Sequence, residues 1–275
     1  MDNNSIPPNI ERSHNNSANE HTIFIPNGQA IGVRAAISWI GDTWDFMSPK
    51  LGMWVLMGII YGAVNLILFI SDFGFILFNL LEPLFSAGII AICETQRMTG
   101  KFKFGKLFYG LHYKCSVLLA IGIIVCGIKI LGSLIYAMID GHNLSQVIFD
   151  DFSLYSNYEA MLISDDSQES FLSSCVFLIT LFLSTACSWF APALVILKDF
   201  SVGKALSISF RAIWKNLLGV LLFLLFIYLL FFISALPLFL GALFTVPLSL
   251  ATSYISYRSV FYKKETQKDD ITVTR

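Results

Sequence analysis

Long, continuously apolar stretches are the feature of this sequence that most restricts its fold. Four of them reach the roughly 20 residues that an α-helix needs to cross a bilayer, and they cover residues 51–71, 73–93, 116–138 and 171–197. A fifth stretch, 216–257, is too long for one such helix and contains Pro237. Because proline breaks a helix, this stretch predicts a tight hairpin with spans at 216–235 and 239–257. The sequence therefore predicts an all-α integral membrane protein with six transmembrane helices.

The composition supports the same fold class. Apolar residues make up 56% and charged residues 13% of the 275 residues, and the mean hydropathy is +0.70. Soluble domains carry roughly 45–50% apolar and about 25% charged residues. The apolar residues follow one another without alternation, which excludes a membrane-spanning β-barrel. Every Lys/Arg cluster lies beside a predicted span, so nucleic acid is not an expected partner.

The distribution of charge predicts the orientation. Lys and Arg are enriched in the cytoplasmic loops of membrane proteins. Of the 18 Lys and Arg residues, all except Lys129 fall on one side of the six-span arrangement: before the first span, in the loops 94–114 and 198–215, and after the last span. The loop 139–170, on the other side, has no Lys or Arg. Its acidic residues are Asp140, Asp150, Asp151, Glu159, Asp165, Asp166 and Glu169. Both termini are therefore expected in the cytoplasm.

The chain is predicted to have three parts. Residues 1–27 are expected to be a disordered cytoplasmic tail, because they are mostly polar and their start lacks the basic and apolar regions of a secretory signal. Residues 28–262 form the six-span membrane domain, and residues 263–275 form a second cytoplasmic tail.

A short segment with helical periodicity precedes the first, third and fifth spans. In 31–47, 103–114 and 204–215, polar residues recur at positions that share one face of a helix, and apolar residues fill the rest. The second and third segments are expected to run straight into their spans, whereas Pro49 should break the first. The repeating unit is thus an amphipathic interfacial helix followed by a helical hairpin, and it occurs three times. Such symmetry is found in membrane proteins with a central pathway, and it also arises by duplication without a transport role.

The position of the three amphipathic helices has two interpretations. Their apolar faces can rest on the membrane, with basic stripes toward anionic lipid headgroups. Alternatively, the three helices can pack on one another as a cytoplasmic cap. The sequence is compatible with both.

Three segments carry a resemblance to a known family. They are WFAPALVIL at 189–197 with GKA at 203–205 and SFRA at 209–212, the segment 32–54 with its tryptophans and Pro49, and SYISYRSVF at 253–261. Over residues 28–262 the chain resembles an uncharacterised family of six-span bacterial inner-membrane proteins. That family is more distantly similar to the membrane domain of some glycerophosphodiester phosphodiesterases. The resemblance implies a bacterial inner membrane and no known catalytic residues.

Two ionisable residues, Glu82 and Lys129, lie inside predicted spans at similar depth. A charge within the bilayer is costly and usually faces a partner or a water-filled cavity. Glu82 and Lys129 are therefore predicted to form an intramembrane ion pair between neighbouring helices. The alternatives are a substrate or proton site at the helix interface, and a Lys129 side chain that extends alone toward the outer surface.

The sequence lacks enzyme motifs, since it has no phosphate-binding glycine loop, no HExxH and no nucleophile elbow. No catalytic residue, cofactor or metal site is predicted, and the five cysteines show no CxxC spacing. The expected function is that of a non-enzymatic structural or accessory component, or a handler of lipid or another hydrophobic molecule. Membrane lipids are the expected partners, with other membrane-protein subunits as an open alternative. A small transporter or channel, with a pathway along the threefold repeat near Glu82 and Lys129, is the alternative function.

Overall fold

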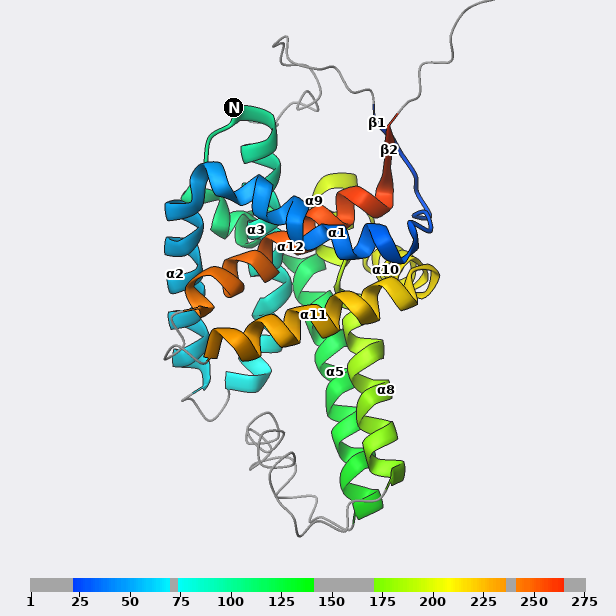
Figure 1. Cartoon of the computed structure of the whole chain (residues 1–275). Coiled ribbons are helices and arrows are strands. Elements are labelled where there is room, and N and C mark those ends of the chain that lie inside the picture. Colours follow the sequence, from blue (N-terminus) through cyan, green and yellow to red (C-terminus); the bar gives the residue numbers. More distant parts are fainter. Residues whose placement is uncertain (1–21, 70–73, 141–170, 236–240, 265–275) are drawn as a thin grey trace, which may run out of the picture.

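The computed structural model of the protein describes residues 22–69, 74–140, 171–235 and 241–264 (Figure 1). These residues are all-α apart from one two-stranded sheet. Its elements are β1 (Thr22–Phe24), α1 (Gly32–Met47), the 3₁₀ turn η1 (Ser48–Lys50), α2 (Leu51–Phe69), α3 (Gly74–Thr99), the 3₁₀ turn η2 (Phe104–Phe108), α4 (Tyr109–His112), α5 (Cys115–Asp140), α8 (Phe171–Ser188), α9 (Ala191–Lys198), α10 (Val202–Lys215), α11 (Leu217–Ala235), α12 (Ala242–Phe261) and β2 (Tyr262–Lys264). Residues 141–170 of the predicted acidic loop, the predicted turn at Pro237 and the outer parts of both predicted tails lie outside the described residues.

Five segments of the described chain are long and apolar enough to cross a membrane. They are Gly32–Leu68, Ile76–Thr99, Cys115–Ile139, Phe171–Lys198 and Leu217–Ser234. The first of them joins α1 to α2 through η1, which contains Pro49. Helix α3 runs six residues beyond the predicted end of its span and thereby brings Glu94, Gln96 and Arg97 into the helix. The chain is thus an all-α protein with several helices suited to a membrane.

Helix α12, which covers most of the sixth predicted span, does not meet the same criterion of length and hydropathy. Its sequence includes several Ser, Thr and Tyr residues and Arg258, which lower the mean hydropathy. The helix packs against α1, α2, α3 and α11 (Figure 1). Many of its residues are buried, including Thr252, Tyr254, Ser256 and Tyr257. A helix surrounded by other helices can carry hydroxyl groups because they find partners there: Thr252 lies 3.2 Å from Thr43, oxygen to oxygen.

The predicted span at 171–197 is broken in two. Helix α8 ends at Ser188 and α9 begins at Ala191, just before Pro192. Proline fits the first turn of a helix but cannot continue one, so Pro192 favours a new start here. The Ser209 side chain of α10 supports the break: its Oγ donates to the Ala186 carbonyl at 2.7 Å and accepts from the Phe190 N–H at 3.0 Å.

Two of the three predicted amphipathic segments are regular helices, α1 and α10. The prediction for 103–114 is wrong, because this segment consists of η2 and the single turn α4. It packs closely on α3: a Cβ added to Gly88 would lie 1.9 Å from the Leu107 carbonyl oxygen, and one added to Gly110 would lie 2.5 Å from the Leu84 carbonyl oxygen. The backbones of η2 and α4 thus contact the backbone of α3 directly, whereas a regular amphipathic helix would pack on α3 through its side chains.

The amphipathic segments do not run straight into the following helices. Lys114, with a left-handed φ of 59°, separates α4 from α5, and Asn216 separates α10 from α11. The apolar face of α1 packs on α11 and α12, and that of α10 packs on α8 and α9. Protein therefore covers much of both faces. Helices α1 and α10 pack on other helices of the protein, which differs from a cap made of the three segments alone. Contact of their remaining surface with lipid headgroups stays a prediction.

The two ends of the described chain are joined. Strands β1 and β2 pair antiparallel, with Ile23 opposite Lys263. The Gln29 side chain extends the contact by donating to the carbonyls of Ser259 and Tyr262, each at 3.1 Å. Residues 22–27, which were expected in a disordered tail, are therefore ordered because they pair with the end of α12 and β2.

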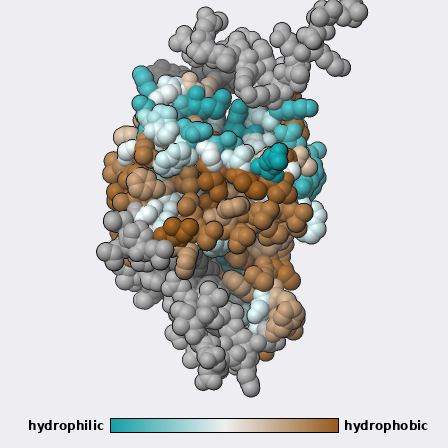
Figure 2. Space-filling view, in the orientation of Figure 1, coloured by the Kyte–Doolittle hydropathy of each residue, from teal (hydrophilic) through white to brown (hydrophobic). Residues whose placement is uncertain are grey.

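Hydrophilic residues gather at one end of the molecule, above a broad hydrophobic band (Figure 2). We call this the polar end; it contains α1, η1, η2, α4, α9, α10, the two strands and the C-terminal ends of α3 and α12 (Figure 1). Large apolar side chains are exposed on the helices of the band, among them Leu66, Ile123, Leu178, Leu225 and Phe232. Such a surface is compatible with lipid and not with water.

Candidate functional site

The polar end contains a partly buried charged cluster built from α3 and α12. The Glu94 carboxylate accepts hydrogen bonds from the Arg97 guanidinium and from the Tyr254 hydroxyl, and Arg97 Nε also donates to the Tyr254 oxygen at 2.9 Å. Tyr254 is fully buried. Hydrogen bonds from two side chains offset much of the free energy that the carboxylate loses when it is removed from water. This cluster is suited to fixing α12 against α3.

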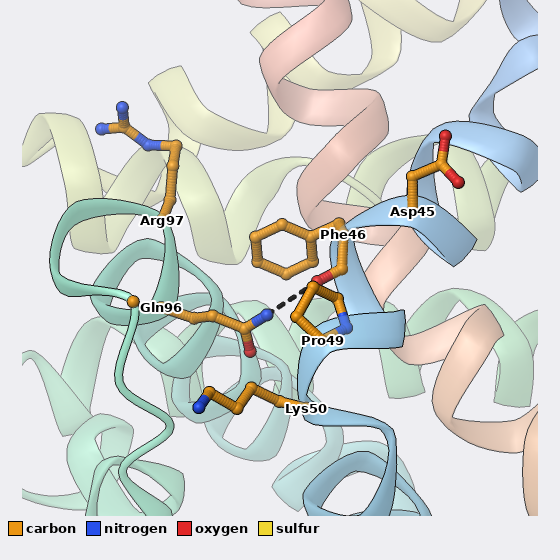
Figure 3. A pocket seen from close by; sticks show the side chains of 7 residues that line it. Asp45, Phe46, Pro49, Lys50, Gln96 and Arg97 are labelled. Atoms are coloured by element: carbon orange, nitrogen blue, oxygen red, sulfur yellow. Dashed lines mark hydrogen bonds between the residues drawn. The ribbon is translucent and has the colours of Figure 1, made fainter. Parts of the chain in front are cut away.

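A second set of hydrogen bonds ties the start of α2 to the end of α3. The buried Trp54 indole donates to Gln96 Oε1 at 3.0 Å, and Gln96 Nε2 donates to the Phe46 carbonyl at 2.7 Å. Figure 3 shows the Gln96 amide turned toward Phe46. Gln96 lies on α3, and its side chain uses its oxygen to bind α2 and its nitrogen to bind α1.

An open groove of about 360 Å³ lies beside Gln96. It is lined by Asp45, Phe46, Pro49, Lys50, Gln96, Arg97 and Gly100. In Figure 3, Asp45 and Lys50 extend on different sides of Phe46 and Pro49, and the Arg97 guanidinium points away from them. The groove therefore combines apolar contacts from Phe46 and Pro49 with one exposed acidic side chain and two exposed basic ones. Of the two basic side chains, Arg97 is already bonded to Glu94 and Tyr254.

A salt bridge joins two tight turns at the polar end. Lys114 Nζ lies 2.6 Å from Asp199 Oδ1. Both residues have left-handed backbone, with φ of 59° and 58°, and non-glycine residues rarely adopt it. The hydrogen bond to Asp199 raises the pKa of Lys114. The pair links the turn before α5 to the turn after α9.

The two residues singled out in the sequence, Glu82 and Lys129, lie on the neighbouring helices α3 and α5. Lys129 Nζ donates to Asn79 Oδ1 at 2.6 Å. Asn79 is one helical turn before Glu82 on α3. Within the described ranges no salt bridge joins Glu82 to Lys129; the salt bridges there are Arg97–Glu94 and Lys114–Asp199. Charge pairing of Glu82 with Lys129 stays a prediction, with Asn79 as the observed partner of the lysine.

Close packing brings α3 and α5 together near this site. A Cβ on Gly122 would lie 2.7 Å from the Leu80 carbonyl oxygen and 3.0 Å from that of Asn79. Pro83 has no N–H and cannot donate the helical hydrogen bond to Asn79. The polar groups of residues 79–82 therefore lie where the backbones of α3 and α5 are in close contact.

Sequence reasoning missed Asn79, Glu94, Gln96 and Tyr254. Glu94 and Gln96 fall in a segment that was expected to be a loop, and only the extension of α3 to Thr99 turns them inward. A signal was present for Glu94, since Arg97 follows it at the helical spacing of an ion pair. No His, Cys, Asp or Glu side chains in the described part of the chain form a group that could hold a metal ion.

The fold and these sites define an α-helical membrane protein whose polar end is held together by buried hydrogen bonds. Comparison with protein-family models gave no match, and neither the curated proteins nor the solved structures gave a similar one.

Proposed function

We propose that the protein is a six-span bacterial inner-membrane protein, with both termini in the cytoplasm, that acts without catalysis as an accessory component binding phospholipid headgroups. The groove beside Gln96 is the observation that carries the binding proposal. It belongs to the polar end and lies where the end of α1 and the turn η1 meet the end of α3.

The pairing of the two strands supports an even number of crossings. Because β1 pairs with β2, the two ends of the described chain lie together, which is in line with both termini on one side of the membrane. Five segments are apolar enough to span. On the proposed six-span path, α12 is the remaining crossing. Two contacts agree with this path, because Trp54 bonds to Gln96 and Tyr254 bonds to Glu94 at the same end of α2, α3 and α12.

The charge pattern supports the orientation. The basic residues of the polar end include Lys103, Lys106, Lys198, Lys204 and Arg258, and Lys and Arg favour the cytoplasmic side. The three hairpins α2–α3, α5–α8 and α11–α12 each follow one segment of the polar end, which supports the threefold repeat. The resemblance of residues 28–262 to six-span inner-membrane proteins is in line with this arrangement.

The topology is tested by cysteine-accessibility labelling of intact cells, in a variant without the five natural cysteines. New cysteines within 139–170 should react with an impermeant reagent from outside. Cysteines within 94–114 and 198–215 should react only after the cells are opened. Reaction of both basic loops from outside would refute the orientation.

The groove offers complementary groups to a phospholipid headgroup. Lys50 supplies an ammonium for a phosphate, and Asp45 supplies a carboxylate for a headgroup ammonium. Phe46 and Pro49 supply apolar contact for the adjoining glycerol region. A zwitterionic headgroup with a primary amine uses both charges, whereas an anionic headgroup uses Lys50 alone.

Purification in mild detergent, followed by mass spectrometry of the intact protein with its retained lipids, tests this site. Lys50→Glu should reduce retained phospholipid about fivefold or more, since one lysine near anionic headgroups contributes about 1 kcal/mol. Lys103→Glu, an exposed change outside the groove, is the matched control. Asp45→Asn should reduce only amine-bearing lipids. Equal lipid retention in Lys50→Glu and Lys103→Glu would contradict the groove as a lipid site.

A small transporter or channel is the second candidate, favoured by the polar contact of Lys129 with Asn79 inside the helix bundle. Its pathway would follow the threefold repeat near Glu82 and Lys129. In this case the double variant Glu82→Gln/Lys129→Met should fold and lose solute movement in vesicles, while lipid retention at the groove stays unchanged.

A further inference from the structure

Helix α3 carries two glutamates in contrasting surroundings, Glu82 and Glu94. They lie about 18 Å apart along the helix axis. Glu94 receives hydrogen bonds from two side chains, Arg97 and Tyr254. Glu82 is partly buried, and no side chain or backbone group in 22–69, 74–140, 171–235 or 241–264 donates a hydrogen bond to its carboxyl group. The two carboxyl groups therefore differ in what compensates a negative charge.

The ionisable groups that face Glu82 come from α5. Lys129 is the charged group that acts on Glu82, and Cys126 lies beside Lys129 on the same helix. The remaining packed elements add no charge at this depth. Tyr61 is the one ionisable side chain of α2, and the ionisable groups of η2, α4, α9 and α12 belong to the polar end.

The directions of the side chains bring the two groups toward each other. Helical side chains lean toward the N-terminus of their own helix. On the proposed path α3 and α5 are antiparallel, so Glu82 leans toward the outer surface and Lys129 leans toward the cytoplasm. Asn79 lies between these directions and holds the ammonium at 2.6 Å. A short movement of the flexible lysine would exchange the Asn79 oxygen for the Glu82 carboxylate.

An ionised carboxylate without hydrogen-bond donors is strongly disfavoured inside a bilayer, whereas a neutral carboxylic acid is not. We propose that Glu82 is an exchangeable proton-binding site within the membrane, controlled by the position of Lys129. In one state Lys129 bonds to Asn79, as in the structure, and Glu82 is protonated. In the other state the proton has left to water, and Lys129 has moved to pair with the Glu82 carboxylate.

An apolar carbodiimide tests the protonated state directly. Dicyclohexylcarbodiimide enters bilayers and reacts with the protonated carboxyl group: the carboxyl oxygen bonds to the central carbon of the reagent, and the acid proton passes to a reagent nitrogen. The adduct then rearranges to a stable N-acylurea on the same residue. The full chain is reconstituted in phospholipid vesicles, treated with the reagent and mapped by mass spectrometry of its peptides.

We expect modification of Glu82 to exceed that of Glu94 about tenfold at about pH 6 and to fall as the pH rises to about 9. Glu94 on the same helix is the internal control, since its two donors favour the ionised form. The unaltered chain suffices for this comparison, so the outcome does not depend on the folding of any variant. An unmodified Glu82 at about pH 6, or modification that does not change up to about pH 9, would overturn the proposal.

Two variants should shift the reaction in opposite directions. Asn79→Leu removes the partner that holds the ammonium, so Lys129 pairs with Glu82 and modification at a given pH decreases. Lys129→Met removes the cation that favours the ionised form, so modification persists to higher pH. Cys126→Ala, a change beside Lys129, should leave the pH profile in place. A shift in the same direction for Asn79→Leu and Lys129→Met would also overturn the proposal.

Discussion

The Tyr254 hydroxyl of α12 donates a hydrogen bond to the Glu94 carboxylate of α3, between residues 160 positions apart in the sequence. Both residues belong to the polar end, and Arg97 completes the cluster. The contact has an energetic consequence, because Glu94 sits on the helix that packs against most of the others.

Removing the hydroxyl should weaken the whole polar end. Tyr254→Phe leaves the buried Glu94 carboxylate with one donor fewer, at a cost of about 1.5–3 kcal/mol for a hydrogen bond to a charged group. We expect a lower unfolding temperature in mild detergent. Tyr228→Phe is the control, since the Tyr228 side chain is 64% exposed. Equal unfolding temperatures for the two variants would show that the hydrogen bond contributes nothing measurable.

The break between α8 and α9 should depend on Ser209. Ser209→Ala removes the hydroxyl that serves both the Ala186 carbonyl and the Phe190 N–H. Leaving these buried backbone groups without that partner should cost about 1–3 kcal/mol. Ser207→Ala, an exposed change on the same helix, should have little effect on the unfolding temperature. If both variants unfold alike, the break is stable without Ser209.

Close packing of η2 on α3 should make Gly88 intolerant of any side chain. In Gly88→Ala the new methyl group would meet the Leu107 carbonyl oxygen at 1.9 Å, so the two segments must separate. Overpacking of this kind typically costs about 1–3 kcal/mol. Gly127→Ala on α5 meets nothing within 4 Å and is the matched control. Folded yield after size-exclusion chromatography should fall for Gly88→Ala alone.

The strand pairing predicts a specific cross-link. Ile23 and Lys263 are opposite each other in the sheet, so cysteines at these two positions should form a disulfide under mild oxidation. In a variant without natural cysteines, the double variant should migrate faster before reduction than after it. The two single variants are the controls. Failure of the pair to oxidise in folded protein would contradict the sheet that joins the two ends.

Helix positions along the chain were largely predictable. The helices α2, α5 and α11 begin and end within two residues of the predicted spans. A run of apolar residues and a proline act locally, through the length of a helix and the loss of one N–H. The same local reasoning placed α1 and α10 correctly and failed for η2 and α4, where glycines allow the backbone itself to pack on α3.

The partners of the polar side chains could not be predicted, because they depend on which helices become neighbours. Nothing near Lys129 in the sequence points to Asn79, which is 50 residues away. Nothing near Glu94 points to Tyr254. The sequence by itself determined which segments are helical and apolar and where charge gathers, since these properties follow from each segment alone. Only the tertiary structure decided that α12 lies among the other helices. It also decided that, among the residues the structure describes, Glu94 has hydrogen-bond donors and Glu82 has none, because hydrogen bonding at a buried site depends on the groups that folding brings within reach.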